Sequence, residues 1–143
     1  HIHDRRQRQM CIRDSDLSAQ PTKIMPLDSI SGGQFGTMAI HSTSDRIFVA
    51  AANDNSTSNQ SPGLVYVYDV NDLSATPTKI TAFDAAANDQ FGHSIATTEN
   101  KVIIGANHDD DDGHASGSFY VYDANDLSAT PTKITAFDAI YDD

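Results

Sequence analysis

The side chains best suited to chemistry form one acidic run, Asp109-Asp110-Asp111-Asp112, which ends at Gly113. Carboxylate oxygens that converge on a glycine turn are the ligands that Ca²⁺ prefers. The candidate calcium ligands are therefore Asp109, Asp110, Asp111 and Asp112. The calcium-loop template, aligned on Gly113, nevertheless places His108 at its first ligand position. The alternative interpretation is a solvated loop whose charges repel one another.

No other set of residues has the spacing of a catalytic or metal site. The sequence lacks a Gly-x-Ser-x-Gly elbow and a phosphate-binding glycine loop. Asp84 and Asp89 are interpreted as turn residues, because aspartate at a turn bonds to nearby backbone. The following histidines lack the His-x-x-x-His and His-x-Glu patterns of zinc sites: His41, His93, His108 and His114. We expect no catalytic residue, no cofactor other than Ca²⁺, and no enzymatic activity from this chain.

Composition narrows the classes of partner. The chain has 143 residues, with 9 Lys+Arg against 20 Asp+Glu and a formal net charge of −11. Nucleic acids and anionic membranes are themselves negative and would be repelled, so neither is an expected partner. No apolar run approaches the roughly 20 residues of a membrane span. The single cysteine, Cys11, excludes an internal disulfide.

The first fifteen residues differ from the rest of the chain. Residues 1–15 hold four of the nine basic residues and the only cysteine. They lack the apolar core and cleavage site of a signal peptide. The segment resembles translated adapter read-through at the end of a metagenomic fragment; the alternative is a disordered basic arm. We therefore divide the chain into a non-native or disordered segment, 1–15, and a single domain, 16–143.

An internal repeat organises residues 16–143. Residues 66–84 match residues 120–138 at 18 of 19 positions, the difference being Val70 against Ala124. The Gln-Phe-Gly triplet that begins at Gln34 recurs at Gln90. Near-identity over nineteen residues indicates duplication, and a period of 54–56 residues is typical of repeat architectures.

Each repeat predicts four short strands and no helix, because segments rich in β-branched residues lie between turn signals and no helical apolar spacing appears. The expected strands of the first repeat are 37–41, 46–51, 63–69 and 78–84. Those of the second are 93–97, 101–106, 117–123 and 132–138. Residues 22–28 are expected to be one strand left over from an earlier repeat.

Four antiparallel strands in about 50–55 residues is the size of a propeller blade. The sequence therefore predicts an all-β propeller fragment with two complete blades, about 34–84 and 90–138, plus the leftover strand. Small residues such as Ala39 and Ala96 in the first strand of each blade suit a place near the central axis. Two of the four blade faces are expected to meet water, since only one pair of faces can stack.

Several motifs together resemble the FG-GAP repeat of integrin α-chain propellers and related bacterial extracellular proteins. They are Phe35-Gly36, Phe91-Gly92, Gly105-Ala106 and the Tyr-Val-Tyr strands at 66–68 and 120–122. Asn107 stands where the family's Gly-Ala-Pro motif has proline. Many family members also hold calcium between the first two strands, but here those connections, 42–45 and 98–100, are too short to wrap a cation.

The resemblance implies an extracellular or cell-surface binding or adhesion scaffold. Its variable loops, 53–62 and 107–116, would contact a glycan, a protein or a matrix component. Further blades of the same chain are the other expected partner, because repeat folds bury each blade against a neighbour. The alternative is a propeller that accompanies a secreted hydrolase or another enzyme whose active site lies outside this fragment.

Overall fold

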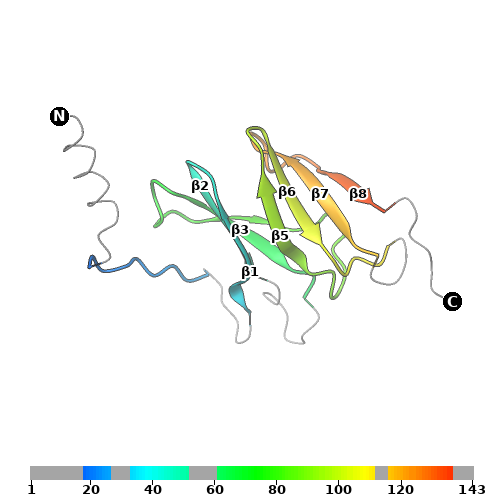
Figure 1. Cartoon of the computed structure of the whole chain (residues 1–143), viewed down its shortest axis with the longest axis horizontal. Helices are drawn as coiled ribbons and strands as arrows, with labels where there is room; N and C mark the ends of the chain where they lie inside the picture. The colour runs from blue at the N-terminus through cyan, green and yellow to red at the C-terminus, as the bar shows by residue number, and fades with distance from the viewer. Residues whose placement is uncertain (1–17, 27–32, 52–60, 112–115, 137–143) are drawn as a thin grey trace, which may run out of the picture.

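The computed structural model describes residues 18–26, 33–51, 61–111 and 116–136. These residues form two four-stranded antiparallel sheets, in which neighbouring strands follow one another along the chain (Figure 1). The first sheet contains β1 (Phe35–Ser42), β2 (Arg46–Ala51), β3 (Leu64–Asp69) and β4 (Thr78–Ile80). The second contains β5 (Phe91–Thr97), β6 (Lys101–Ala106), β7 (Ser118–Asp123) and β8 (Thr132–Thr135). The prediction of two four-stranded all-β blades is confirmed, although the two sheets do not form a closed ring.

None of the described residues forms a helix of the length and apolarity that a membrane crossing requires.

The turns after β3 and β7 have the same construction in both sheets. Asp69 accepts a hydrogen bond from the Asn71 amide, and Asp72 accepts one from the Ser74 amide. The second sheet repeats both bonds, 54 residues later, at Asp123 and Asp126. Aspartate at such positions closes the turn with its own side chain. The near-identical sequences of the two segments therefore encode the same local structure.

The outer strands are shorter than the sequence predicts. β4 ends at Ile80 rather than at Asp84, because the chain then turns out of the sheet toward the second blade. The Thr81 carbonyl accepts a hydrogen bond from the Tyr122 hydroxyl, and Ala82 is buried. These contacts with the neighbouring blade replace the backbone pairing of a longer strand.

The expected leftover strand is not paired as a strand in its described part. Residues 22–26 run as extended chain with no strand partner among the described residues. Ile24 nevertheless packs against the buried cluster that contains Tyr66 and Tyr68. A single strand without its own sheet has no neighbour for its backbone groups, so only its side-chain packing remains.

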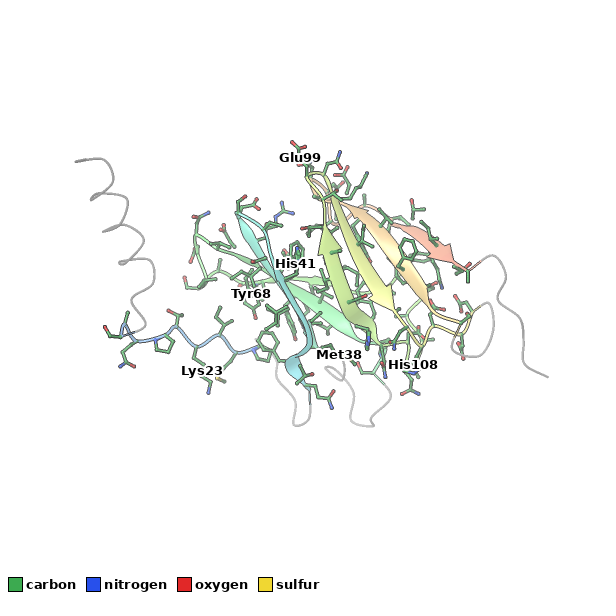
Figure 2. The ribbon with its side chains drawn as sticks, in the orientation of Figure 1. Lys23, Met38, His41, Tyr68, Glu99 and His108 are labelled. Atoms are coloured by element: carbon green, nitrogen blue, oxygen red, sulfur yellow. The ribbon has the colours of Figure 1, made fainter. Side chains whose placement is uncertain are left out.

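The main core lies between the two sheets and joins them. β1 and β5 lie next to each other, and His41 Nε2 is 2.8 Å from Thr97 Oγ1 across the boundary (Figure 2). The first sheet contributes mainly Phe48, Ala50, Val65, Val67 and Ile80. The second contributes mainly Phe91, Val102, Ile104, Tyr120 and Tyr122. One face of each blade is thus buried against the other.

The Phe91–Gly92 turn makes the closest approach between the blades. Gly92 has a φ of +95°, and a Cβ at this position would lie 3.0 Å from both Ala50 Cβ and Val65 Cγ2. The Phe91 amide also donates a hydrogen bond to the Pro62 carbonyl at 2.8 Å. A residue with a side chain would be strained in this backbone conformation and would push against the facing sheet.

Gly36 is the equivalent glycine of the first repeat and provides a matched control. Its φ is +76°, but an added Cβ would make only ordinary contacts, 3.5 Å or more from its neighbours. We expect Gly36→Ala to lower the free energy of unfolding by about 1–2 kcal/mol through backbone strain alone. Gly92→Ala should cost about 1–3 kcal/mol more, because it also overpacks the blade interface. Urea unfolding measures both, and equal losses would contradict this account of the interface.

Candidate functional site at the blade junction

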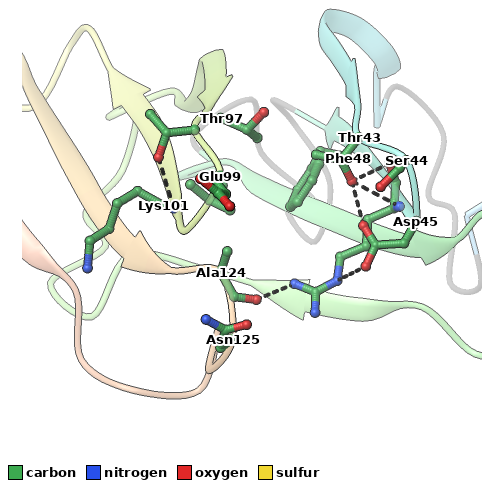
Figure 3. A pocket seen from close by; sticks show the side chains of 12 residues that line it. Thr43, Ser44, Asp45, Phe48, Thr97, Glu99, Lys101, Ala124 and Asn125 are labelled. Carbon is green, nitrogen blue, oxygen red and sulfur yellow. Dashed lines mark hydrogen bonds and ion pairs between the residues drawn. The ribbon is translucent and has the colours of Figure 1, made fainter.

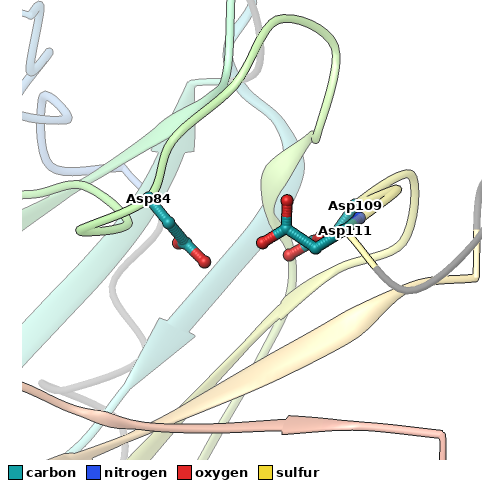
Figure 4. A group of neighbouring side chains, drawn as sticks. All are labelled: Asp84, Asp109 and Asp111. Carbon is teal, nitrogen blue, oxygen red and sulfur yellow. Dashed lines mark hydrogen bonds between the residues drawn. The ribbon is translucent and has the colours of Figure 1, made fainter.

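Three carboxylates converge on one ammonium group where the two blades meet. Lys133 on β8 places its Nζ 2.6 Å from Asp84 Oδ2, 2.7 Å from Asp109 Oδ2 and 2.6 Å from Asp111 Oδ2. Asp84 comes from the connection between β4 and β5, whereas Asp109 and Asp111 follow β6 (Figure 4). The cluster therefore ties the end of the first blade to the loop edge of the second.

Tyr120 completes the cluster from β7. Its hydroxyl lies 2.7 Å from Asp84 Oδ1 and 3.0 Å from Asp109 Oδ2, so its one proton can be donated to either carboxylate. The ammonium of Lys133 lies 5.5 Å from the centre of the Tyr120 ring. Both groups stabilise the ionised carboxylates, and both come from the blade opposite Asp84.

Asp109 also holds the base of the β6–β7 loop. This aspartate is only 2% exposed, and its Oδ2 accepts a hydrogen bond from Ser118 Oγ at 2.6 Å. Its Oδ1 accepts one from the Asp111 amide, and its carbonyl accepts one from the Gly117 amide at 2.9 Å. The two described ends of the loop are thus fastened to one buried residue.

The charges within the cluster shift each other's pKa. Burial alone would raise the pKa of Asp109, but hydrogen bonds from Lys133 and Ser118 outweigh it and lower the pKa to about 2. The pKa of Asp84 is also lowered, because Lys133 and Tyr120 outweigh its burial. Burial alone would lower the pKa of Lys133, yet the three carboxylates raise it above its usual value. Burial and the hydrogen bond to Asp84 raise the pKa of Tyr120.

The carboxylates that lie together in the structure differ from the four consecutive aspartates, 109–112, that the sequence indicates. Asp84, Asp109 and Asp111 offer carboxylate oxygens within 4.8 Å of one another. Asp110 is exposed and does not belong to this group, and Asp112 lies outside the described residues. Calcium binding by the run stays a prediction, with the Lys133 ammonium already bonded to three of the oxygens that a cation would use.

Asp84 has a longer-range role than the turn assigned to it from the sequence. Its described partners are Tyr120 and Lys133, both in the next blade. A signal for this exists, because aspartate stands at the same position of each repeat, at residues 28, 84 and 138. Asp89, by contrast, does close a turn, accepting a hydrogen bond from the Ala86 amide at 2.7 Å.

The histidines form no further site among the described residues. His41 bonds to Thr97 across the blades, whereas His93 and His108 are exposed. His114 lies outside the described residues. Within the described part of the chain, His93 belongs to no group of side chains that could hold a metal ion.

A polar pocket lies at the opposite edge of the blade junction. It has a volume of about 280 Å³, and the β1–β2 and β5–β6 turns form its walls (Figure 3). Arg46 Nη1 crosses it to donate a hydrogen bond to the Ala124 carbonyl at 2.6 Å. Asp45 and Glu99 add negative charge to the lining. Arg46 thus links the first sheet to the second across this pocket.

One comparison with known proteins, that with protein families, agrees with this geometry. The FG-GAP repeat family matches residues 76–122, which run from β4 of the first blade to the end of β7 in the second. The chain carries an FG-GAP repeat. No curated protein and no solved structure matches it. The matched FG-GAP segment includes the Phe91–Gly92 turn together with Asp84, Asp109 and Tyr120, so the family region contains both the blade contact and most of the ionic cluster.

The lowered pKa of Asp109 predicts an acid-sensitive fold. Because the folded-state pKa of Asp109, about 2, lies below the ordinary aspartate pKa of 3.8, this group stabilises the fold fully above pH 4 and progressively less as the pH falls toward 2. The loss from Asp109 should be about 2 kcal/mol. Asp89 has the opposite effect on the pH dependence of stability, because burial raises its pKa.

Urea unfolding at a series of pH values measures this loss. Asp109→Asn should be less stable at pH 7 and should lose less stability on acidification than the unmodified chain. Asp110→Asn is the control, because Asp110 is exposed and should leave the acid loss unchanged. Parallel pH curves for the unmodified chain and Asp109→Asn would contradict the assignment.

Removal of the Lys133 ammonium should allow the three carboxylates of the cluster to bind a metal ion. Lys133→Met leaves three carboxylates without their ammonium and should lower the free energy of unfolding by about 3 kcal/mol, because the buried carboxylate of Asp109 loses its counter-ion. Millimolar Ca²⁺ should raise the thermal midpoint of this variant and leave that of the unmodified chain nearly unchanged.

Lys101→Met, at an exposed lysine, is the matched control and should show neither effect. A large calcium shift in the unmodified chain would show that Ca²⁺ binds beside Lys133 or at the acidic run. The absence of a shift in Lys133→Met would show that the three carboxylates do not form a calcium site.

Proposed function

We propose that this FG-GAP chain is an extracellular or cell-surface binding scaffold, in which a constant blade framework presents variable loops to a glycan, a protein or a matrix component. The proposal assigns binding rather than catalysis to these residues. It rests on the family match, which suggests a propeller-like scaffold, and on the contrast between framework and loops.

That contrast is the observation that carries the proposal. The strand segments 66–84 and 120–138 differ at one position, whereas the loops 53–62 and 107–116 carry one and four acidic residues respectively. Both loops join the second strand of a sheet to the third, so they leave the sheets at the same edge. A rigid framework with divergent loops at one edge is the usual arrangement of binding surfaces.

The ionic cluster holds the base of the second loop, 107–116, in place, which supports a role for this loop in binding. Asp109, Ser118 and Lys133 fix the point from which the loop leaves the sheet, and Asp110 and Asp111 lie beside it at the surface. A ligand that binds there meets an acidic surface, which favours cationic or hydroxyl-rich groups.

A loop exchange tests the proposal. Residues 107–117 are replaced by residues 52–63, which keep an aspartate at the third position and a glycine at the last. Binding is measured on an array of immobilised glycans and on a panel of matrix proteins. We expect the unmodified chain to bind a defined subset and the exchanged chain to lose that subset while it keeps its thermal unfolding transition.

Val70→Ala is the control, because it introduces the residue found at the equivalent turn position, Ala124, away from both loops. It should bind as the unmodified chain does. Unchanged binding after the loop exchange would contradict the assignment of binding to the loop.

A further inference from the structure

A glutamine in a left-handed backbone conformation precedes the first strand of each sheet. Gln34 has a φ of 52° and Gln90 a φ of 57°. Few residues other than glycine and asparagine adopt positive φ, because the Cβ then lies too close to the backbone. The connection before β5 does hold an asparagine in this conformation, Asn88 with a φ of 71°. The two glutamines therefore occupy a backbone conformation that is unfavourable for their residue type.

Contacts within the fold account for the phenylalanine and the glycine of the Gln-Phe-Gly triplet, but not for the glutamine. Phe91 is fully buried, and Gly92 makes the closest approach between the blades. The carboxamide of Gln90 forms no hydrogen bond with any described residue. Both repeats nevertheless have glutamine here, although the residue after the triplet differs, Thr37 in the first repeat and His93 in the second.

Gln90 lies between the described ends of the two variable loops. On one side of it, the Asp89 carbonyl accepts a hydrogen bond at 3.2 Å from the amide of His108, which belongs to the second loop. On the other side, the Phe91 amide donates one at 2.8 Å to the carbonyl of Pro62, where the first loop ends. The backbone before and after Gln90 is thus bonded to one loop each, and its side chain is half-buried.

The chemistry around Gln90 favours a neutral glycan. A carboxamide both donates and accepts hydrogen bonds, which is the combination that the hydroxyl groups of a sugar require. The loop residues bonded on either side of it, Pro62 and His108, offer no large apolar side chain of the kind that anchors a protein partner. Asp110 is exposed on the second loop, and the chain has a net charge of −11, so an anionic glycan would be repelled.

We propose that Gln90 is a specificity-determining residue for a neutral glycan that binds at the described ends of the two variable loops. This inference rests on the proposed binding function, and it names the ligand class and one residue that selects it. The hydrogen bonds on either side of Gln90 fix its position relative to both loops, so less freedom is lost when a ligand binds. Unfavourable backbone conformations that the surrounding structure holds in place are a feature of binding sites.

A glycine substitution separates the side chain from the backbone conformation. Arrays of neutral and anionic glycans and a panel of matrix proteins first identify what the full chain binds. Isothermal titration calorimetry then measures its affinity for the neutral glycan with the strongest signal. Gln90→Gly removes the carboxamide, and glycine adopts positive φ without strain. We expect this variant to bind the glycan at least tenfold more weakly than the unmodified chain, and to unfold at the same or a higher urea concentration.

Gln34→Gly is the matched control, because Gln34 has the same backbone conformation but its chain neighbours make no described hydrogen bond to the second variable loop. It should keep the affinity of the unmodified chain. Unchanged binding by Gln90→Gly, or an equal loss in both variants, would overturn this inference and leave the proposed binding function standing. Binding only to matrix proteins or to anionic glycans would do the same. A lower urea midpoint for Gln90→Gly would overturn it by showing that the glutamine stabilises the fold. A chain that binds nothing on the arrays or the panel would overturn both.

Discussion

The packing of the Phe91–Gly92 turn against the β2–β3 face is the contact on which the rest of the structure depends. Gly92 has a positive φ, and a Cβ at this position would lie only 3.0 Å from Ala50 Cβ and Val65 Cγ2, so a glycine fits between the sheets with the least strain. Phe91 is fully buried beside the turn, and its amide is bonded to the Pro62 carbonyl. This contact fixes β5 next to β1, and it brings the carboxylate of Asp84 to the second blade.

The ionic cluster follows from that placement. Asp84 belongs to the first blade by sequence, yet its hydrogen bonds go to Tyr120 and Lys133 of the second. Because Asp109 shares Lys133 with it, the group that joins the blades also fastens the β6–β7 loop. Lys133 and Tyr120 therefore take part both in the contact between the blades, through Asp84, and in the positioning of the variable loop, through Asp109.

The repeat predicts most of the fold, because strand alternation and turn residues are local signals. The strands Arg46–Ala51 and Lys101–Ala106 have the bounds that the sequence indicates. The outer strand β4 is shorter because contacts with the next blade at Thr81 and Ala82 replace backbone pairing, and a sequence pattern within one blade does not report such contacts.

The site was less predictable for a related physical reason. Adjacent aspartates in a run point in different directions, so Asp109 and Asp111 join the cluster while Asp110 faces solvent. Lys133 and Asp84 lie 49 residues apart and meet only because two blades stack. The recurrence of aspartate at residues 28, 84 and 138 is a sequence signal that the position matters, but it does not indicate which residues the carboxylate contacts.

The most direct test of blade packing is a nuclear Overhauser measurement on methyl-labelled protein. The structure predicts cross-peaks between the Val65 methyl groups and the Gly92 α-protons, with further cross-peaks from the Phe91 ring to side chains of the first blade. Their absence, in spectra that show both sheets intact through cross-strand backbone contacts, would contradict the central claim that the two blades are joined at this turn.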